Sequence, residues 1–281
     1  MKKILLAAAV AFCTINAFSL DQSFVPSGKI NSYTKTEYSV ASKFGDYFRS
    51  VNSKKVHVFD NTGLETSISI YDSKDQLTNT VTFTYDISRN LLSSSYTDIN
   101  GTVITKTVYA YQSDGNLASE SEYNASDKLT GKTIYKYEGN KTTESYYDGN
   151  GALLSRVIYK TDDSGKTVEE TAYYGDGSFS SSKAYTYNDA GKIIQVDLKE
   201  APEKTASKQV YRYDANNVLT EIQSYNHTNT LVQRIIYKND AKGNPTRISV
   251  YEVAEKFGAT ANELVDITEF AYKYSGAGSA K

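Results

Sequence analysis

Apolar and polar residues alternate along short runs of the chain, and polar turns separate one run from the next. In the run 129–137, Leu129 and Tyr135 fall on one side of an extended strand, while Lys132 and Ile134 fall on the other. A period of two, with turns rich in Gly, Asn and Asp, predicts antiparallel hairpins, because a parallel crossover needs a dozen or more residues. The chain is therefore predicted to be all-β, an up-and-down antiparallel meander.

Tyrosine marks the same place in successive units of this meander. Aligned positions recur at intervals of 26, with one interval of 24: Tyr85, Tyr111, Tyr137, Thr161, Tyr187, Tyr213 and Asn239. A second aromatic column lies two residues earlier: Phe83, Tyr109, Tyr135, Tyr159, Tyr185, Tyr211 and Tyr237. A fixed period is the signature of a repeat architecture, here with two strands in each unit. One unit is shorter by two residues. Because side chains alternate with a period of two in a strand, this change leaves every later side chain on the same face of the sheet.

The β-repeat domain is predicted to span residues 57–274 and to hold about sixteen strands. A sheet of that size, about 75 Å wide, is predicted to coil or fold over as an extended sheet. A closed barrel would be too wide for inward Leu and Tyr side chains to fill. An outer-membrane β-barrel pore remains an alternative, because an exported chain with an even strand number and one apolar face matches it in outline. Polar strands such as 167–173, with Glu169, count against a wall that faces hydrocarbon.

Charged residues follow the same two-strand unit. Runs with Arg156 and Lys160 alternate with runs that carry Glu120, Glu144 or Glu170. Neighbouring strands are therefore predicted to form cross-strand ion pairs, each contributing about 0.2–1 kcal/mol and mostly solvated. The formal net charge of −2 becomes −4 without Lys2 and Lys3, which is too small to indicate binding to nucleic acid.

The two ends of the chain depart from the repeat. Residues 1–17 have the positive start, short apolar stretch and small residue of a secretory signal peptide, so the protein is expected to be exported to the periplasm, the cell surface or the medium. Cys13 lies within this segment, and the mature chain has no cysteine for disulfides or metal sites. Residues 18–56 are predicted to be a capping segment, with a possible short helix around Val40, Phe44, Tyr47 and Phe48 that covers the first sheet edge. Residues 275–281 are expected to be a flexible tail.

The last unit contains an insertion. Nine extra residues lie between Tyr251 and Val265, and the stretch 254–264 is predicted to form one or two helical turns. No stretch after the signal peptide is long and apolar enough for a transmembrane helix.

The segment from Tyr147 to Leu153, Tyr-Asp-Gly-Asn-Gly-Ala-Leu, resembles the Tyr-Asp-x-x-Gly-x-Leu signature of the YD-repeat family of bacterial Rhs and insecticidal-toxin shell proteins. Residues 213–219 follow the same pattern with Asn217 in place of the glycine. The resemblance covers residues 57–251 and implies a strand-rich shell. The unit here is longer than the family's, and a complete toxin-enclosing shell would need a far longer chain.

The usual parts of an active site are scarce. His57 lies in a Val-His-Val strand and His227 in a turn, so a nucleophile activated by histidine is not expected. The stretch 162–165 resembles a fragment of a calcium loop but lacks the alternating carboxylates, and it is better explained as a turn. We therefore expect no enzymatic activity, no cofactor and no metal.

The tyrosines are the remaining candidate for a binding surface. Their regular spacing favours an internal ladder, although an exposed row would suit sugar rings or peptides. The candidate ligand or partner residues are Tyr109, Tyr135, Tyr159, Tyr185, Tyr211, Tyr237 and, in the insertion, Phe257. The sequence predicts a non-enzymatic, exported structural or adhesive binding module; the alternatives are an outer-membrane pore and a glycan-binding module. The expected partner is a protein or a cell-surface glycan and not nucleic acid, and self-association through a sheet edge is possible.

Overall fold

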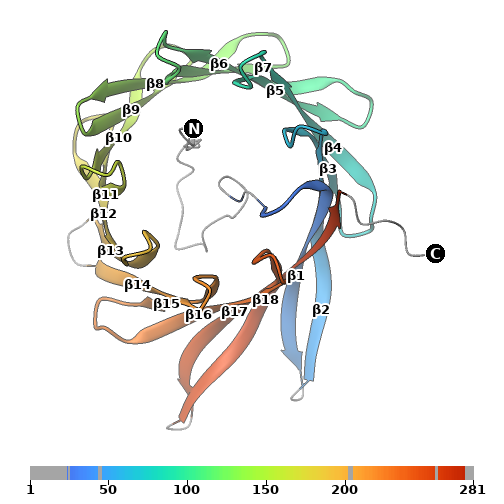
Figure 1. Ribbon diagram of the computed structural model, residues 1–281, viewed down its shortest axis with the longest axis vertical. Coiled ribbons are helices and arrows are strands. Elements are labelled where there is room, and N and C mark those ends of the chain that lie inside the picture. Colours follow the sequence, from blue (N-terminus) through green and yellow to red (C-terminus); the bar gives the residue numbers. More distant parts are fainter. Residues whose placement is uncertain (1–23, 25, 44–45, 202–204, 257–258, 276–281) are drawn as a thin grey trace.

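Eighteen antiparallel strands form one closed barrel in the computed structural model, which describes residues 24, 26–43, 46–201, 205–256 and 259–275 (Figure 1). The strands are β1 Ile30–Lys43, β2 Asp46–Phe59, β3 Glu65–Tyr71, β4 Leu77–Tyr85, β5 Leu91–Asp98, β6 Val103–Tyr111, β7 Leu117–Asn124, β8 Leu129–Glu138, β9 Lys141–Asp148, β10 Leu153–Thr161, β11 Thr167–Tyr174, β12 Phe179–Tyr187, β13 Ile193–Glu200, β14 Thr205–Tyr213, β15 Leu219–Tyr225, β16 Leu231–Asn239, β17 Pro245–Lys256 and β18 Ala259–Tyr274.

The meander predicted from the alternation is confirmed, because each strand pairs with the next along the chain. The barrel closes where β1 pairs with both β2 and β18, with Tyr33 opposite His57 on one side and Tyr272 on the other. The sheet therefore closes and does not fold over. Closure is possible because the inward face mixes tyrosine with Glu, Lys and Ser, so water can fill a lumen that side chains leave open. No described strand has an unpaired edge, so the self-association expected at a sheet edge has no such edge to use.

The turns owe their shape to an acidic or amide side chain at the first position. Asp60 accepts hydrogen bonds from the backbone amides of Thr62 (2.8 Å) and Leu64 (3.0 Å), and Gly63 adopts a φ of 85°. The hydroxyl and amide of Thr62 and the amide of Leu64 hold the pKa of the Asp60 carboxyl below its usual range. The pattern returns at Asp98, Asp148, Asp162, Asp214 and Asp240. These carboxylates are thus occupied by backbone, and the described residues contain no metal-binding group of His, Cys, Asp and Glu.

A bulge beside most turns reverses the side-chain face. Tyr111 pairs with Leu117, but Ala110 pairs with Ser119, so Ala118 is an extra residue. Paired residues share a face, and Leu117 therefore lies on the face of Tyr111 while Ser119 lies on the opposite face. Strict alternation from Leu117 would place Glu120 on the face opposite Tyr109, whereas the bulge places it on the same face as Tyr109.

The first tyrosine column fastens each unit to the previous one. The Tyr111 hydroxyl donates to the carbonyl of Leu91 (2.9 Å), the first residue of β5, twenty positions earlier. Equivalent bonds join Tyr85 to Glu65, Tyr137 to Leu117, Tyr187 to Thr167, Tyr213 to Ile193 and the Asn239 amide to Leu219. Each of these hydrogen bonds joins residues twenty positions apart, which explains why the length of the repeat varies so little.

The two segments that break the repeat are strands and not helices. The described residues of 40–48 belong to β1 and β2, and those of 254–264 belong to β17 and β18. The helical spacing of Val40, Tyr47 and Phe48 was therefore misleading, because the long hairpin they form is itself part of the wall. Residues 30–56 add two strands to the predicted sixteen and close the barrel in place of a cap.

Several sequence predictions lie outside the described residues. The signal peptide, Phe257 and residues 276–281 of the tail belong to this group, whereas Ser275 donates its amide to the carbonyl of Lys29 (2.9 Å). Within the described part, no helix is long and apolar enough to cross a membrane.

The two ends of the barrel differ. At one end, here the terminal rim, lie Ile30, Tyr274 and the turns that follow even-numbered strands. At the other end, the hairpin rim, lie the turns that follow odd-numbered strands, and the long hairpins β1–β2 and β17–β18 project beyond the ring (Figure 1).

Candidate functional site

The tyrosine columns line the inside of the barrel. Residues 26–29 lie inside the ring (Figure 1), and Phe24 packs against Tyr33 and Phe270 with ring centroids 5.9 Å apart in both pairs. Phe24 therefore marks the inward side of the sheet at Tyr33. Paired residues on neighbouring strands share a side of the sheet, so the strand pairings show that both tyrosine columns also point inward. We call this side the lumen face and the opposite side the outer face.

All six candidate tyrosines lie on the lumen face, and none is freely exposed. Tyr135 is buried, and the other five are half-buried. Burial raises the pKa of Tyr109 to about 12 and raises the pKa of Tyr159 further. Their hydroxyls are thus protonated donors at any physiological pH. Phe257, the seventh candidate, lies outside the described residues.

Three glutamates stand between these tyrosines. Glu120 is paired with Tyr109, Glu144 with Tyr135 and Glu170 with Tyr159. Each glutamate also accepts a hydrogen bond from the tyrosine one unit further on: Tyr135 to Glu120 at 2.8 Å, Tyr159 to Glu144 at 3.1 Å and Tyr185 to Glu170 at 2.9 Å. The result is a continuous row of alternating phenol and carboxylate across β6–β12, which we call the tyrosine–glutamate sector.

The three carboxylates of this sector differ in whether a basic side chain neutralises their charge. Glu170 forms an ion pair with Lys183 (2.8 Å). Glu120 and Glu144 have no cationic partner among the described residues, and both are buried. Burial raises the pKa of Glu120, and burial together with the charges of Glu120 and Glu170 raises the pKa of Glu144 to about 7. Near neutral pH, Glu144 therefore exchanges its proton with the medium, and a cation brought into the lumen would favour the charged form.

The opposite part of the lumen wall contains an apolar cluster. Strands β15–β18 and β1 supply a buried cluster of Ile30, Tyr33, Ile222, Ile235, Ile248 and Phe270, against which Phe24, Tyr211 and Tyr237 pack. This apolar sector lies across the ring from β8 and β9 (Figure 1). The lumen face thus carries buried carboxylates on β7 and β9 and a buried apolar cluster across the ring. Nearer the hairpin rim, Lys35, Glu37, Glu252 and Asp266 lie on the same face of β1, β17 and β18 as that cluster.

His57 occupies the second-column position of the first unit. Its ring stacks on Tyr33, with centroids 4.2 Å apart, and its Nδ1 lies 2.5 Å from Oε1 of Glu65. Among the buried side-chain atoms of the described residues, Nε2 of His57 is the one that has no hydrogen-bond partner. His57 is therefore a buried residue at the seam of the barrel.

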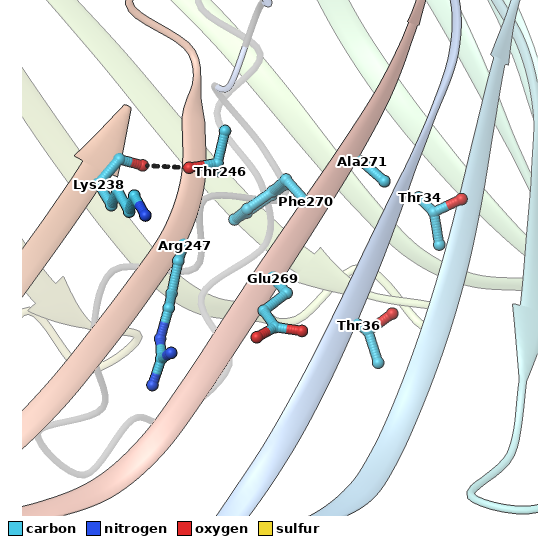
Figure 2. Close-up of a pocket in the computed structure, with 8 residues that line it drawn as sticks. All are labelled: Thr34, Thr36, Lys238, Thr246, Arg247, Glu269, Phe270 and Ala271. Carbon is cyan, nitrogen blue, oxygen red and sulfur yellow. Dashed lines mark hydrogen bonds between the residues drawn. The ribbon is translucent and has the colours of Figure 1, made fainter. Parts of the chain in front are cut away.

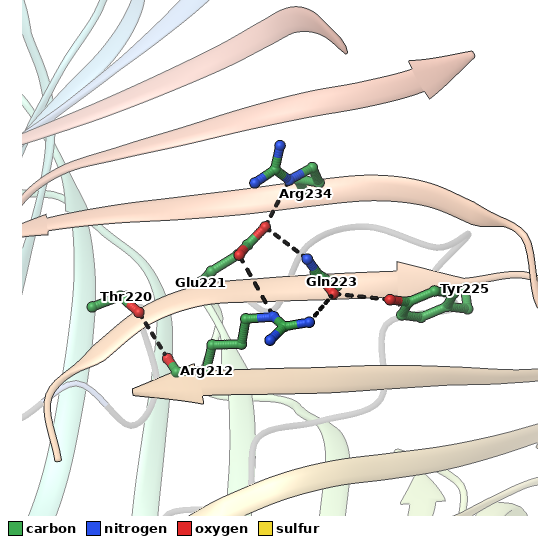
Figure 3. A network of polar contacts seen from close by, with 6 residues as sticks. All are labelled: Arg212, Thr220, Glu221, Gln223, Tyr225 and Arg234. Atoms are coloured by element: carbon green, nitrogen blue, oxygen red, sulfur yellow. Dashed lines mark hydrogen bonds and ion pairs between the residues drawn. The ribbon is translucent and has the colours of Figure 1, made fainter. Parts of the chain in front are cut away.

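The outer face carries the ion pairs that the sequence predicts. Glu221 lies between Arg212 and Arg234, with 2.6 Å to the Nε of Arg234, and Gln223 links Arg212 to Tyr225 (Figure 3). Lys160 and Glu169 form a second pair at 3.0 Å. In Figure 3 the far wall of the barrel lies behind these strands, which places the network on the outside.

A shallow hollow on the outer face lies over β16–β18 and β1 (Figure 2). Its lining combines Lys238, Arg247 and Glu269 with the hydroxyls of Thr34 and Thr36. The hollow thus combines both charges with threonine hydroxyls, and no histidine lines it.

Glu120 and Glu144 are predicted to form cross-strand ion pairs, but they instead accept hydrogen bonds from tyrosines in the lumen. The periodicity contains a signal for them. Starting from Glu120, the repeat places Glu144, Glu170, Val196, Ile222 and Ile248 at equivalent positions. The column changes from acidic to aliphatic half-way along, which marks the two sectors.

No protein-family model matches the chain, and no curated protein matches it. Among solved structures, a porin-like protein from Bacteroides uniformis aligns with 88% of this chain and 99% of its own, at 11% identity and a TM-score of 0.48. A LolA superfamily protein from Nitrosomonas europaea aligns with 90% of this chain and 89% of its own, at 12% identity and a TM-score of 0.29.

A toxin-complex chain, TcdB2-TccC3 crystallised with Cdc42, aligns with 87% of this chain but only 16% of its own, at 10% identity and a TM-score of 0.29. The alignment is a partial structural similarity to a toxin-complex chain. At these scores and identities none of the three structures bears on function.

Proposed function

We propose that this protein is an exported, non-enzymatic binding module that holds a cationic ligand with apolar surface inside its barrel. The observation that carries the proposal is the division of the lumen wall. Glu120 and Glu144 lack a cationic partner among the described residues, and they lie across the ring from the buried cluster around Ile235 and Phe270. A ligand with one charged and one apolar side complements both sectors, since ammonium groups pair with carboxylates and hydrocarbon leaves water.

The candidate tyrosines contribute in two ways. Their hydroxyls orient the carboxylates, as Tyr159 does for Glu144, and their rings give the acidic sector an aromatic surface that attracts cations. A glycan would find hydroxyl and carboxylate partners here too, but it would leave the apolar sector uncovered.

Isothermal titration calorimetry with an amphipathic peptide of lysine and leucine tests the proposal, and a peptide with glutamate in place of lysine is the control ligand. We expect the lysine peptide to bind and the glutamate peptide not to bind. The double variant Glu120→Gln/Glu144→Gln is expected to weaken binding about tenfold, in line with the loss of one charge-assisted contact. Glu169→Gln, on the outer face of the same sector, should leave affinity unchanged; equal weakening by Glu169→Gln would refute a site in the lumen.

A pore in an outer membrane is the second candidate, and the closed ring of eighteen strands favours it. In that case Arg156 and Lys132, near the middle of their strands on the outer face, would contact hydrocarbon, at a cost of about 2–4 kcal/mol each at the bilayer midplane. Planar bilayer recordings separate the candidates: stable conductance steps support the pore, and their absence together with peptide binding supports the binding module.

A further inference from the structure

A short segment ahead of β1 lies against the apolar sector. It consists of Phe24 and residues 26–29, which we call the N-terminal strap, and Figure 1 shows residues 26–29 inside the ring. The ring of Phe24 packs edge-to-face on Tyr33 and at a tilt on Phe270. Phe24 is half-buried in these contacts, so it covers hydrocarbon of the cluster that would otherwise face the lumen.

A buried amide in the turn between β16 and β17 anchors the strap. Asn244, which is 1% exposed, accepts from the amide of Ser27 (2.6 Å) and donates to the carbonyl of Ser27 (2.8 Å). Its amide also donates to the hydroxyl of Tyr274 (2.7 Å). Asn116, at the equivalent position of the turn between β6 and β7, instead donates to Asp114 in its own turn (2.8 Å). The Asn244 side chain thus holds a segment 217 positions away in the chain.

The ring of Phe24 can leave the cluster without breaking the barrel. The buried members of the cluster belong to β1 and β15–β18, where strand pairing fixes them, whereas the strap precedes β1 and belongs to no strand. Three residues separate Phe24 from the anchored Ser27, and an extended chain of that length spans about 10 Å. The ring can therefore move off Tyr33 and Phe270 while the anchor at Ser27 stays in place.

We propose that the N-terminal strap is an autoinhibitory contact, in which Phe24 occupies part of the apolar sector until a ligand displaces it. The inference rests on the proposed function, because that function makes the apolar sector one half of the ligand site. The apolar part of a ligand competes with the Phe24 ring for the same surface of Tyr33 and Phe270. The apparent affinity is lowered accordingly, since the binding-competent state is the one in which the ring is displaced.

Nile red, a neutral apolar dye, tests the cover without any cationic ligand. We expect Phe24→Ala to give several-fold stronger Nile red fluorescence than the wild type, because the cluster is uncovered. Phe48→Ala removes the same side chain from β2, where it is 56% exposed, and should match the wild type. Circular dichroism checks that each variant is folded. Fluorescence of folded Phe24→Ala no higher than that of the wild type would overturn the cover.

Calorimetry with the lysine and leucine peptide tests the displacement. Phe24→Ala should bind this peptide about fivefold more tightly than the wild type, because no ring has to leave first. Asn244→Ala loosens the anchor and should also tighten binding, whereas Asn116→Ala, at the equivalent turn position, should bind as the wild type does. Binding that Phe24→Ala weakens or leaves unchanged would overturn the autoinhibitory contact and spare the proposed function.

A fluorescent reporter follows the strap itself. The chain contains no tryptophan, so Phe24→Trp places a single tryptophan on the cluster. We expect its emission to move to longer wavelength and its quenching by acrylamide to increase when the peptide saturates the protein. Unchanged emission and quenching at saturation would overturn the displacement. If neither the wild type nor Phe24→Ala binds the peptide, the proposed function fails, and with it displacement by this ligand; a raised Nile red signal would still identify Phe24 as the cover of the cluster.

Discussion

The tyrosine–glutamate sector and the apolar sector are built from the same repeat, and they differ at one inward position of each unit. That position holds Glu120, Glu144 and Glu170 in the first sector and Ile222 and Ile248 in the second, with Val196 on β13 between the two sectors. Backbone pairing is the same in both. The difference teaches that the backbone ladder and turns specify the barrel, while the lumen column is free to vary and sets what the interior can bind.

Exchanging the two kinds of residue should have the largest effect. Ile222 is 3% exposed, so Ile222→Glu removes a buried aliphatic group and places a carboxylate among apolar neighbours. We expect a loss of about 4 kcal/mol in the free energy of unfolding at neutral pH. Urea denaturation measures it. Ile236→Glu on the outer face, at 36% exposure, is the matched control and should change stability by less than about 1 kcal/mol. Equal losses would mean that the two faces are not distinct.

Truncating a tyrosine in the other sector should cost slightly less. Tyr159→Ala removes a ring that is mostly buried and leaves Glu144 without its donor, for a loss of about 3 kcal/mol. Tyr159→Phe keeps the ring and should lose about 1 kcal/mol. An unchanged thermal midpoint for Tyr159→Ala would show that the lumen column is surface and not part of the packing.

The pH dependence of stability should also distinguish the sectors. The pKa of Glu144 is raised to about 7 in the folded protein, above its ordinary value of 4.5, so the protonated form is favoured by folding. The corresponding stability is present below pH 4.5 and is lost as the pH rises through 7, on the order of 3 kcal/mol. Glu144→Gln should flatten this slope in urea titrations across that range. Glu169→Gln should not flatten it, because Lys160 lowers the pKa of Glu169.

The smallest expected change in stability concerns the hydrogen bond of the first tyrosine column, which occurs in both sectors. Tyr111→Phe removes the hydroxyl that donates to the Leu91 carbonyl and should cost about 1 kcal/mol. Tyr123→Phe is its control, because the hydroxyl of Tyr123 has no partner among the described residues. Indistinguishable melting midpoints for the two variants would remove the hydrogen bond as the reason for the fixed period.

Much of this arrangement is present in the sequence. The period, the strand identity and the polarity of the turns follow from local patterns, and they predicted the meander correctly. The bulges were not predicted, because Ala118 looks like any strand residue, and its insertion moves Glu120 to the lumen face. Closure was predicted only for the pore alternative, since it depends on β1 pairing with β18, more than two hundred residues away in the chain. The strands 40–43 and 46–48 were taken for a helix because a short apolar spacing does not distinguish the two.

The lumen as a site for a cationic ligand is tested most directly by the pH dependence of binding. Calorimetry with the lysine and leucine peptide should show tighter binding above the pKa of Glu144, about 7, than below it, since the carboxylate is then charged. Glu144→Gln should reduce that difference, while binding to the apolar sector persists weakly at both pH values. Affinity that is the same on both sides of this pKa, or a pH dependence that Glu144→Gln leaves intact, would contradict the account.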